Sequence, residues 1–402
     1  MSKRVLVRGF FLWSLASSAA LAQRSTPASR PPLQGAQAWR MSAERAIRGI
    51  TVGPIESAHH PGRGYGSELC DIALQDARDL GANWVSITPF GRVYDLMPTG
   101  VALSYEAPFR ENQTAVTRAI QQAHAAGLKV MLVPHLWVET GEWRGFIDPG
   151  DDVGWETWSA GYFGFVEQWA KLARNTQVEM LVVGVELRSW VTTQRAASFS
   201  TIIGKLRRIY PGLLTYAANW DDVFDTVVWG ELDLIGVNAF FPLAKQANAQ
   251  QSELSRESRR VAGELEELAE LWQRPVMFTE FGYTTRQDPA LEPWLWPEHL
   301  TGVVPDELAQ ANAYRALLGA VIDAPWFAGG FVWRVFADPY DFSQEPEWGF
   351  SPRWKLAELV LEDAFRAHWA SDGSPELGHA LTSWSATRQH LIGIEPLGRV
   401  AR

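Results

Sequence analysis

Eight short apolar runs, separated by amphipathic stretches, constrain the fold of this 402-residue chain more than any other sequence feature. Their near-continuous apolar character is typical of strands that are buried on both faces. Eight such strands alternating with helices predict an α/β fold, a closed (β/α)8 TIM barrel in one domain. The runs are Gly49–Ile55, Trp84–Pro89, Lys129–Leu136, Met180–Leu187, Leu213–Asn219, Leu232–Phe240, Pro275–Phe281 and Gly330–Val335.

The stretches between the runs carry apolar residues at helical spacing. Gly81 and Gly127 follow two of them at the position where a left-handed residue commonly ends a helix. An open, doubly wound sheet is the alternative architecture, but no run is followed by the G-x-G-x-x-G pattern of many such sheets. The expected helices are Glu68–Leu80, Gln113–Ala126, Thr157–Arg174, Ala196–Ile209, Glu253–Leu271, Glu307–Ile322 and Lys355–Arg366, with a short helix around Asp221–Val228.

The two ends of the chain differ in composition from this central segment. Residues 1–22 combine early basic residues, an apolar stretch and an A-x-A cleavage site, which is typical of a secretory signal peptide, with an uncleaved anchor as the alternative. Residues 23–45 have the composition of a linker, the barrel is expected over 46–369, and 370–402 form a C-terminal tail with no assigned role. We therefore expect a secreted or periplasmic protein without stable membrane insertion.

Charge and cysteine content exclude several function classes. The formal net charge of −10, with no basic stripe, argues against a nucleic-acid partner. The single cysteine, Cys70, permits neither an intrachain disulfide nor a thiolate metal cluster, and we expect it to be a buried apolar residue. The sequence contains neither an H-E-x-x-H motif nor a G-x-S-x-G motif. We therefore expect no metal and no cofactor.

The chain contains 20 tryptophans, which is more than core packing ordinarily needs. An indole face covers the apolar face of a pyranose ring, so sugar-binding clefts often contain this residue. We assign about half of the tryptophans to the core and expect the others to line a cleft. The expected partner is a polysaccharide or oligosaccharide substrate, and the chain is expected to be a monomer.

Two glutamates occupy equivalent positions at the ends of apolar runs. Glu186 ends the fourth run and Glu280 ends the seventh, and the active sites of such barrels lie at the carboxyl ends of the strands. A carboxylate is costly to bury there unless it is paired or used in catalysis. Two carboxylates facing one gap provide the acid and the nucleophile or base that glycosidic cleavage needs. The alternative is a structural ion pair with an arginine at the barrel mouth, for which Arg92, Arg188 and Arg334 are candidates.

The sequence resembles the retaining glycoside hydrolases that carry catalytic glutamates on strands four and seven, and more closely Glycoside Hydrolase Family 113, whose known members are endo-β-1,4-mannanases. The resemblance covers about Arg48 to His368. It implies a glycoside hydrolase that cleaves a β-linked polysaccharide by double displacement, with Glu186 as the acid/base and Glu280 as the nucleophile. The segments that carry it are Leu128–His135, Trp143–Pro149, Gly184–Leu187, Phe278–Tyr283 and Gly349–Lys355.

Two positions depart from the pattern of the larger clan. Clan members usually have Asn before the acid/base, where it binds the 2-hydroxyl of the sugar, and this chain has Val185. Many members also have a Tyr after strand six that orients the nucleophile, whereas Phe240 and Phe241 stand here. Tyr283 is a candidate replacement for that Tyr. Both departures bear on mannan specificity more than on hydrolysis.

Further polar and aromatic residues at strand ends and in loops are candidates for substrate binding. The resemblance implies that Trp333, which ends the eighth run, stacks beneath the cleaved sugar, with a place in the core as the alternative. Arg92 is expected to hydrogen-bond the nucleophile or to form a loop salt bridge. His135 and Asn238 either bind sugar or are structural, and Asn219 either binds sugar or caps the next helix. The substrate-binding candidates are Arg92, His135, Trp137, Trp143, Asn219, Trp220, Asn238, Tyr283 and Trp333.

Three other functions remain open from the sequence. A non-catalytic carbohydrate-binding barrel would keep the tryptophan platforms but hold the two glutamates too far apart. A glycosidase of another linkage, or a transglycosylase, would use the same pair of glutamates on a different sugar. A metal-dependent hydrolase is the third alternative.

Overall fold

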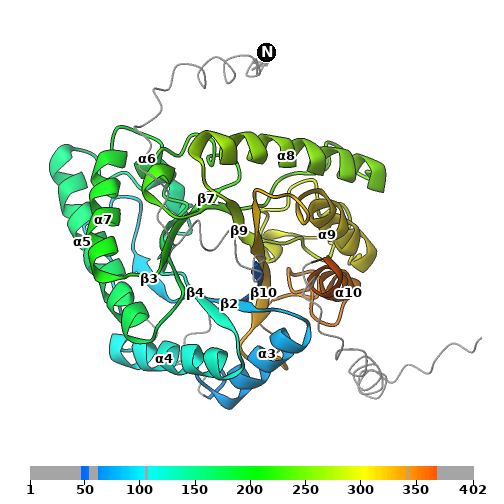
Figure 1. Cartoon of the computed structure of the whole chain (residues 1–402), viewed down its shortest axis with the longest axis horizontal. Helices are drawn as coiled ribbons and strands as arrows, with labels where there is room; N and C mark the ends of the chain where they lie inside the picture. The colour runs from blue at the N-terminus through cyan, green and yellow to red at the C-terminus, as the bar shows by residue number, and fades with distance from the viewer. Residues whose placement is uncertain (1–46, 54–61, 105–106, 342, 344, 369–402) are drawn as a thin grey trace, which may run out of the picture.

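Eight parallel strands form the closed barrel that the sequence predicts, as Figure 1 shows in the computed structural model. The structure describes residues 47–53, 62–104, 107–341, 343 and 345–368. Neighbouring strands around the ring follow the order β1-β2-β4-β6-β7-β8-β9-β10, and β10 closes on β1. The strands are β1 (Ile47–Gly53), β2 (Trp84–Ile87), β4 (Lys129–Leu132), β6 (Met180–Val185), β7 (Leu213–Asn219), β8 (Ile235–Asn238), β9 (Val276–Phe281) and β10 (Phe327–Phe336).

Helices surround the barrel and cover its outer face (Figure 1). Side chains cap three of the helix starts: Ser67, Asp151 and Asp306 each accept a hydrogen bond from a backbone amide in the first turn. Gly81 and Gly127 adopt φ values of +107° and +76°, which confirms their predicted left-handed conformation. The helices are α3 (Glu68–Asp79), α4 (Phe109–Ala125), α5 (Asp152–Asn175), α6 (Arg188–Val191), α7 (Ala196–Ile209), α8 (Gln251–Trp272), α9 (Glu307–Val321) and α10 (Leu356–Asp363).

Apolar side chains fill both the inside of the barrel and the space between strands and helices. Trp84 and Phe331 meet edge to face inside, with ring centroids 6.3 Å apart. Gly49 makes room for this packing, because a Cβ there would lie 2.3 Å from the Phe331 ring. Outside the strands, Trp158 and Trp169 on α5 are fully buried, as expected for the core tryptophans.

Several local features differ from the sequence-based expectation. The predicted strand Lys129–Leu136 divides into β4 and a separate strand β5 (His135–Val138), which pairs in parallel with β3 (Phe90–Val93) beyond the barrel. The short helix predicted around Asp221–Val228 is wrong, because residues 220–225 form a turn. Short helices η1 (Arg144–Phe146), η2 (Trp229–Glu231), η3 (Pro297–His299) and η4 (Ala364–His368) lie in the connections and at the end of the described chain.

The predicted signal peptide, linker and C-terminal tail lie outside the described residues. In the part of the chain that the structure describes, no helix is long and apolar enough to span a membrane. Cys70 is fully buried, and burial raises the pKa of its thiol to about 11, which confirms the prediction of a buried apolar residue.

Candidate active site

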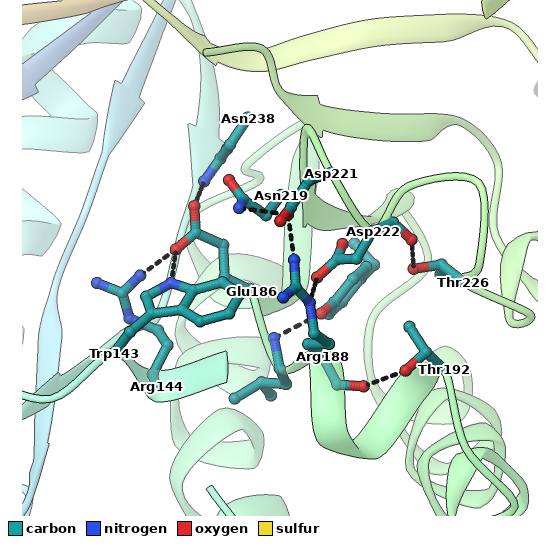
Figure 2. Close-up of polar contacts among 12 residues, drawn as sticks. Trp143, Arg144, Glu186, Arg188, Thr192, Asn219, Asp221, Asp222, Thr226 and Asn238 are labelled. Atoms are coloured by element: carbon teal, nitrogen blue, oxygen red, sulfur yellow. Dashed lines mark hydrogen bonds and ion pairs between the residues drawn. The ribbon is translucent and has the colours of Figure 1, made fainter. Parts of the chain in front are cut away.

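Glu186 lies directly after β6, the fourth strand around the barrel, and three side chains bind its carboxylate (Figure 2). The indole Nε1 of Trp143 donates to Oε2 at 2.8 Å, and the Arg144 guanidinium donates to the same oxygen. Asn238 Nδ2 donates to Oε1 at 2.9 Å. The Glu186 backbone has a φ of +52°, and its amide donates to the carbonyl of Ala217 on β7 at 2.8 Å. The carboxylate is therefore held from three directions in a nearly dry position.

The orientation of Asn238 follows from its second partner. Asn238 ends β8, and the hydroxyl of Thr279 on β9 donates to its Oδ1 at 2.8 Å. Because the oxygen of the amide faces this hydroxyl, its nitrogen faces Glu186. These two hydrogen bonds therefore connect β9, β8 and the residue after β6 at the mouth of the barrel.

Glu280 lies near the end of β9, the seventh strand, with only 7% of its surface exposed. Burial, and then the charge of Glu186, raise the pKa of this carboxyl to about 8, while Arg144 and Arg334 act in the opposite direction. Because the charge of Glu186 acts on the carboxyl of Glu280, the two side chains lie near each other at the barrel mouth. The predicted placement of two glutamates at matching ends of strands four and seven is confirmed.

Arg188 and two aspartates form a second group of charges, which contacts the Trp143 ring. The Arg188 guanidinium lies 4.7 Å from the Trp143 ring centroid. Arg188 Nε donates to the buried Asp222 at 3.1 Å, and its terminal nitrogen donates to Asp221. Figure 2 shows this chain of contacts beside Glu186. Burial raises the pKa of Asp222 to about 7, against the influence of Arg188, which lowers it.

Aromatic residues form the other side of the mouth. Phe240, Trp333 and Phe350 pack together, with Trp220 and Trp296 against them. The Arg334 guanidinium carbon lies 5.1 Å from the Trp333 ring and 5.5 Å from the Trp296 ring. Trp220 also stacks on Trp294, at 5.1 Å and 21°, and Trp294 is 39% exposed. These rings provide the apolar surface that a sugar-binding cleft requires.

The small β3–β5 sheet contributes a second aromatic surface. Phe90 packs on His135 with ring centroids 4.7 Å apart, and Trp137 beside them is 41% exposed. Arg92 lies 5.7 Å from the Trp137 ring and donates to Glu139 Oε1 at 3.3 Å. Burial, with the nearby Arg144, holds the pKa of His135 well below its usual range, so its imidazole is neutral.

The family of the chain follows from its sequence. The sequence profile of Glycoside Hydrolase Family 113 matches residues 59–347, which is more than half of the chain. The chain belongs to Glycoside Hydrolase Family 113. A search of the curated proteins gives no match.

Solved structures show the same barrel. The family 113 β-mannanase AaManA from Alicyclobacillus acidocaldarius, in complex with ManMIm, superposes with a TM-score of 0.69 at 26% identity, covering 81% of this chain and 99% of that one. A second family 113 β-1,4-mannanase gives 0.69 at 22% identity, with 80% and 99% covered. GH5_18 from Streptomyces cattleya, in complex with GlcNAc, gives 0.52 at 16% identity, with 82% of each chain covered. The two structures below 25% identity support the fold alone.

Several residues of this family 113 glycoside hydrolase have partners that their predicted roles did not anticipate. Trp143, a substrate-binding candidate, lies directly before η1 and donates to Glu186. Arg92 pairs with Glu139, so the salt bridge foreseen as its alternative role is present. Asn219 donates to Asp221 at 2.7 Å, within the turn that replaces the expected helix.

Tyr283 is fully buried against Tyr314, and in the described chain its hydroxyl has no hydrogen-bond partner. Tyr283 therefore does not orient Glu280.

Sequence reasoning missed Arg144 and Thr279. Arg144 begins the short helix η1, and nothing in its local pattern indicates that it reaches Glu186. Thr279 directly precedes Glu280 within an apolar strand, where it resembles a residue of the barrel wall. A metal centre has no support in the described part of the chain, where no group of three His, Cys, Asp or Glu side chains is arranged to hold an ion.

Proposed function

We propose that this glycoside hydrolase is a retaining endo-β-mannanase with Glu186 as the acid/base and Glu280 as the nucleophile. The observation that carries the proposal is the position of the two carboxylates, at the ends of β6 and β9, where the charge of one raises the pKa of the other. Retaining glycosidases need two carboxyl groups about 5–5.5 Å apart across the scissile bond. We expect that separation in a complex with bound sugar, and about 6.5–9.5 Å would instead indicate inversion.

The proposed substrate class comes from the relatives. The β-mannanase AaManA is 26% identical to this chain, and the match covers 99% of that chain. Aromatic rings follow several strands of the barrel, with the exposed Trp137 on β5 and Trp220, which stacks on Trp294, after β7. An extended set of aromatic surfaces suits an enzyme that binds several sugars of a chain, so we propose endo cleavage of a β-mannan.

The proposed chemistry proceeds in two displacements. Glu280 attacks the anomeric carbon while the bond to the leaving oxygen breaks, and Glu186 gives its proton to that oxygen. Water then attacks the anomeric carbon of the glycosyl-enzyme. Glu186 takes the proton of this water as the bond to Glu280 breaks. The product keeps the anomeric configuration of the substrate.

We also propose that the protein is exported. Residues 1–22 have the charge, apolar stretch and A-x-A site of a signal peptide, and a polysaccharide substrate is found outside the cytoplasm. Cleavage after Ala22 gives a mature chain that begins at Gln23. Mass spectrometry of the exported protein tests this, and an active cytoplasmic form that retains Met1 contradicts it.

The proposed function is tested by incubating the purified protein with mannans, glucans, xylans and galactans. We expect a rapid fall in the viscosity of a mannan solution and the release of mannooligosaccharides. Nuclear magnetic resonance of the first products is expected to show the β-anomer before mutarotation. Cleavage of another glycan in preference to mannan contradicts the substrate, release of the α-anomer contradicts retention, and binding without cleavage supports the carbohydrate-binding alternative.

A further inference from the structure

We propose that Trp143 and Arg144 are positioning residues that leave Oε1 of Glu186 as the oxygen that exchanges a proton with the substrate. This inference rests on the proposed function of Glu186 as the acid/base. It concerns a loop whose contacts with that carboxylate are not apparent from the strand pattern. Its basis is the distribution of donors over the two oxygens of Glu186.

The two oxygens of Glu186 are not equivalent. A carboxylate oxygen has two lone-pair directions. Oε2 accepts from the Trp143 indole and from the Arg144 guanidinium, so both of its directions are used. Oε1 accepts from Asn238, the only donor to it among the described residues, and one direction remains. A proton on Oε2 would displace a donor, whereas a proton on Oε1 would not. Oε1 is therefore the oxygen that can meet the glycosidic oxygen.

Both donors to Oε2 are held by elements other than the strand that carries Glu186. Arg144 Nε donates to the carbonyl of Leu136 on β5 at 3.0 Å. The Trp143 ring contacts the Arg188 guanidinium at 4.7 Å and Phe146 edge to face at 5.1 Å. Each donor thus has a second contact that fixes its direction. Through Arg144 and Trp143, the β3–β5 sheet and α6 therefore help to fix the position of the Glu186 carboxylate.

The contact between Arg144 and Glu186 is nearly dry. The exposed fractions of the two side chains are 14% and 10%. Little water competes for the carboxylate, so the ion pair and the indole hydrogen bond determine its rotamer. In addition, proton transfer to a leaving group depends on sub-ångström placement of the acid, and a displacement of about 1 Å can reduce the rate by about 10²-fold. Trp143 therefore acts on catalysis through Glu186, and Arg144 does so too while also lowering the pKa of Glu280. For this reason each variant is assayed at its own pH optimum.

The test measures how the rate depends on the leaving group. Arg144→Met removes the guanidinium, and Trp143→Phe removes the indole N–H while keeping a ring against Arg188. Aryl β-mannosides or mannobiosides of graded leaving-group acidity report the glycosylation step, alongside mannan. Arg195→Met is the matched control, because Arg195 pairs with Asp152 and lies 5.5 Å from the Trp155 ring but does not contact Glu186.

We expect Arg144→Met to reduce kcat/KM on mannan by about 10²-fold, and the rate on dinitrophenyl glycosides by only a few fold, so that the dependence on leaving group becomes steeper. Trp143→Phe is expected to show the same pattern with a smaller loss, and Arg195→Met to leave the dependence unchanged. The thermal midpoints of all three variants show whether they are folded.

A loss that is equal on all substrates, or no loss in either variant, overturns the positioning role. A rise in KM alone, with kcat unchanged, also overturns it, because the residues would then bind sugar directly. The companion variant Glu186→Ala separates this outcome from failure of the proposed function. If Glu186→Ala is leaving-group dependent and Arg144→Met is not, only the present inference fails. If Glu186→Ala itself lacks that dependence, the acid/base assignment fails as well.

Discussion

The two glutamates stand at matching strand ends but have opposite surroundings. Three side chains donate to Glu186: Trp143, Arg144 and Asn238. No side chain of the described residues donates to the carboxylate of Glu280, which is buried, with a pKa raised to about 8. The carboxylate of Glu186 is therefore fixed by hydrogen bonds, and that of Glu280 is buried without a side-chain donor among the described residues.

The hydrogen bonds match the proposed division of labour, whereas the raised pKa of Glu280 means that its carboxyl must lose a proton before it can attack. An acid/base must present one oxygen in a defined direction during both displacements, and fixed donors provide that direction. A nucleophile must approach the anomeric carbon, and few hydrogen bonds have to be broken when its carboxylate moves into contact. The neighbours of the two glutamates, rather than their strand positions, therefore distinguish their proposed roles.

The largest expected effect comes from removing the carboxylate of Glu280. Glu280→Ala deletes the group that forms the covalent intermediate, so turnover should collapse on mannan and on activated aryl glycosides alike, by more than about 10⁴-fold. Azide should restore some activity by attacking from the vacated side, giving a glycosyl azide of inverted configuration. Substantial residual activity on either substrate would show that Glu280 is not the nucleophile.

Removing the anchored carboxylate should give a smaller and more selective loss. Glu186→Ala is expected to reduce hydrolysis of mannan by about 10²–10⁴-fold, because general acid catalysis matters most for a poor leaving group. Aryl glycosides with good leaving groups should still form the glycosyl-enzyme, and added azide should give a product with the configuration of the substrate. If the two alanine variants exchange these behaviours, the roles are reversed.

The same substitution at both sites should change stability in opposite directions. Burial raises the pKa of Glu280 from 4.5 to about 8 in the folded chain. Between these two pH values the folded chain binds more protons than the unfolded chain. The free energy of unfolding therefore falls as the pH rises from about 4.5 to about 8. Glu280→Gln should therefore stabilise the fold at about pH 9, by about 1–3 kcal/mol. Glu186→Gln leaves Arg144 without its carboxylate and should destabilise the fold by on the order of 3 kcal/mol. Urea unfolding at about pH 9 measures both, and changes of the same sign would refute the contrast.

The smallest expected effect is on the pH dependence of activity. Arg334 lowers the pKa of Glu280, and the charge of Glu186 raises it. Arg334→Met should therefore move the acidic limb of kcat/KM to higher pH, because ionised Glu280 then forms later. Glu186→Gln, assayed on a dinitrophenyl glycoside that needs no acid, should move that limb to lower pH. If the acidic limb of kcat/KM lies at the same pH in both variants as in the wild type, these charges do not act on the nucleophile.

The fold and the two glutamates were predictable from the sequence because they depend on local pattern. Buried parallel strands give continuous apolar runs, and a charged residue at the end of such a run is conspicuous. Glu186 and Glu280 stand at such positions, and both ends of the α7 prediction, Ala196–Ile209, agree with the structure. The β3–β5 sheet was not predictable in this way, since its strands extend beyond the barrel after short interruptions.

The partners of Glu186 were not predictable, because they depend on how loops return to the mouth. Trp143 and Arg144 lie more than 40 residues before Glu186, with a separation of 43 positions for Trp143 and 42 for Arg144. Nothing in their spacing marks the contact. Asn238 was identified as a polar strand end, but its amide turns toward Glu186 only because Thr279 binds its oxygen.

The central claim, that Glu280 attacks the sugar, is tested most directly by trapping the covalent intermediate. A 2-deoxy-2-fluoro-β-mannobioside with a dinitrophenyl leaving group should form the glycosyl-enzyme and then hydrolyse slowly, because fluorine at C2 slows both displacements while the leaving group speeds the first. Peptide mass spectrometry after proteolysis locates the fluorosugar. We predict that it is attached to Glu280, with one equivalent per chain and loss of activity in parallel. Attachment to Glu186, or time-dependent inactivation without a label on either glutamate, would contradict the assignment.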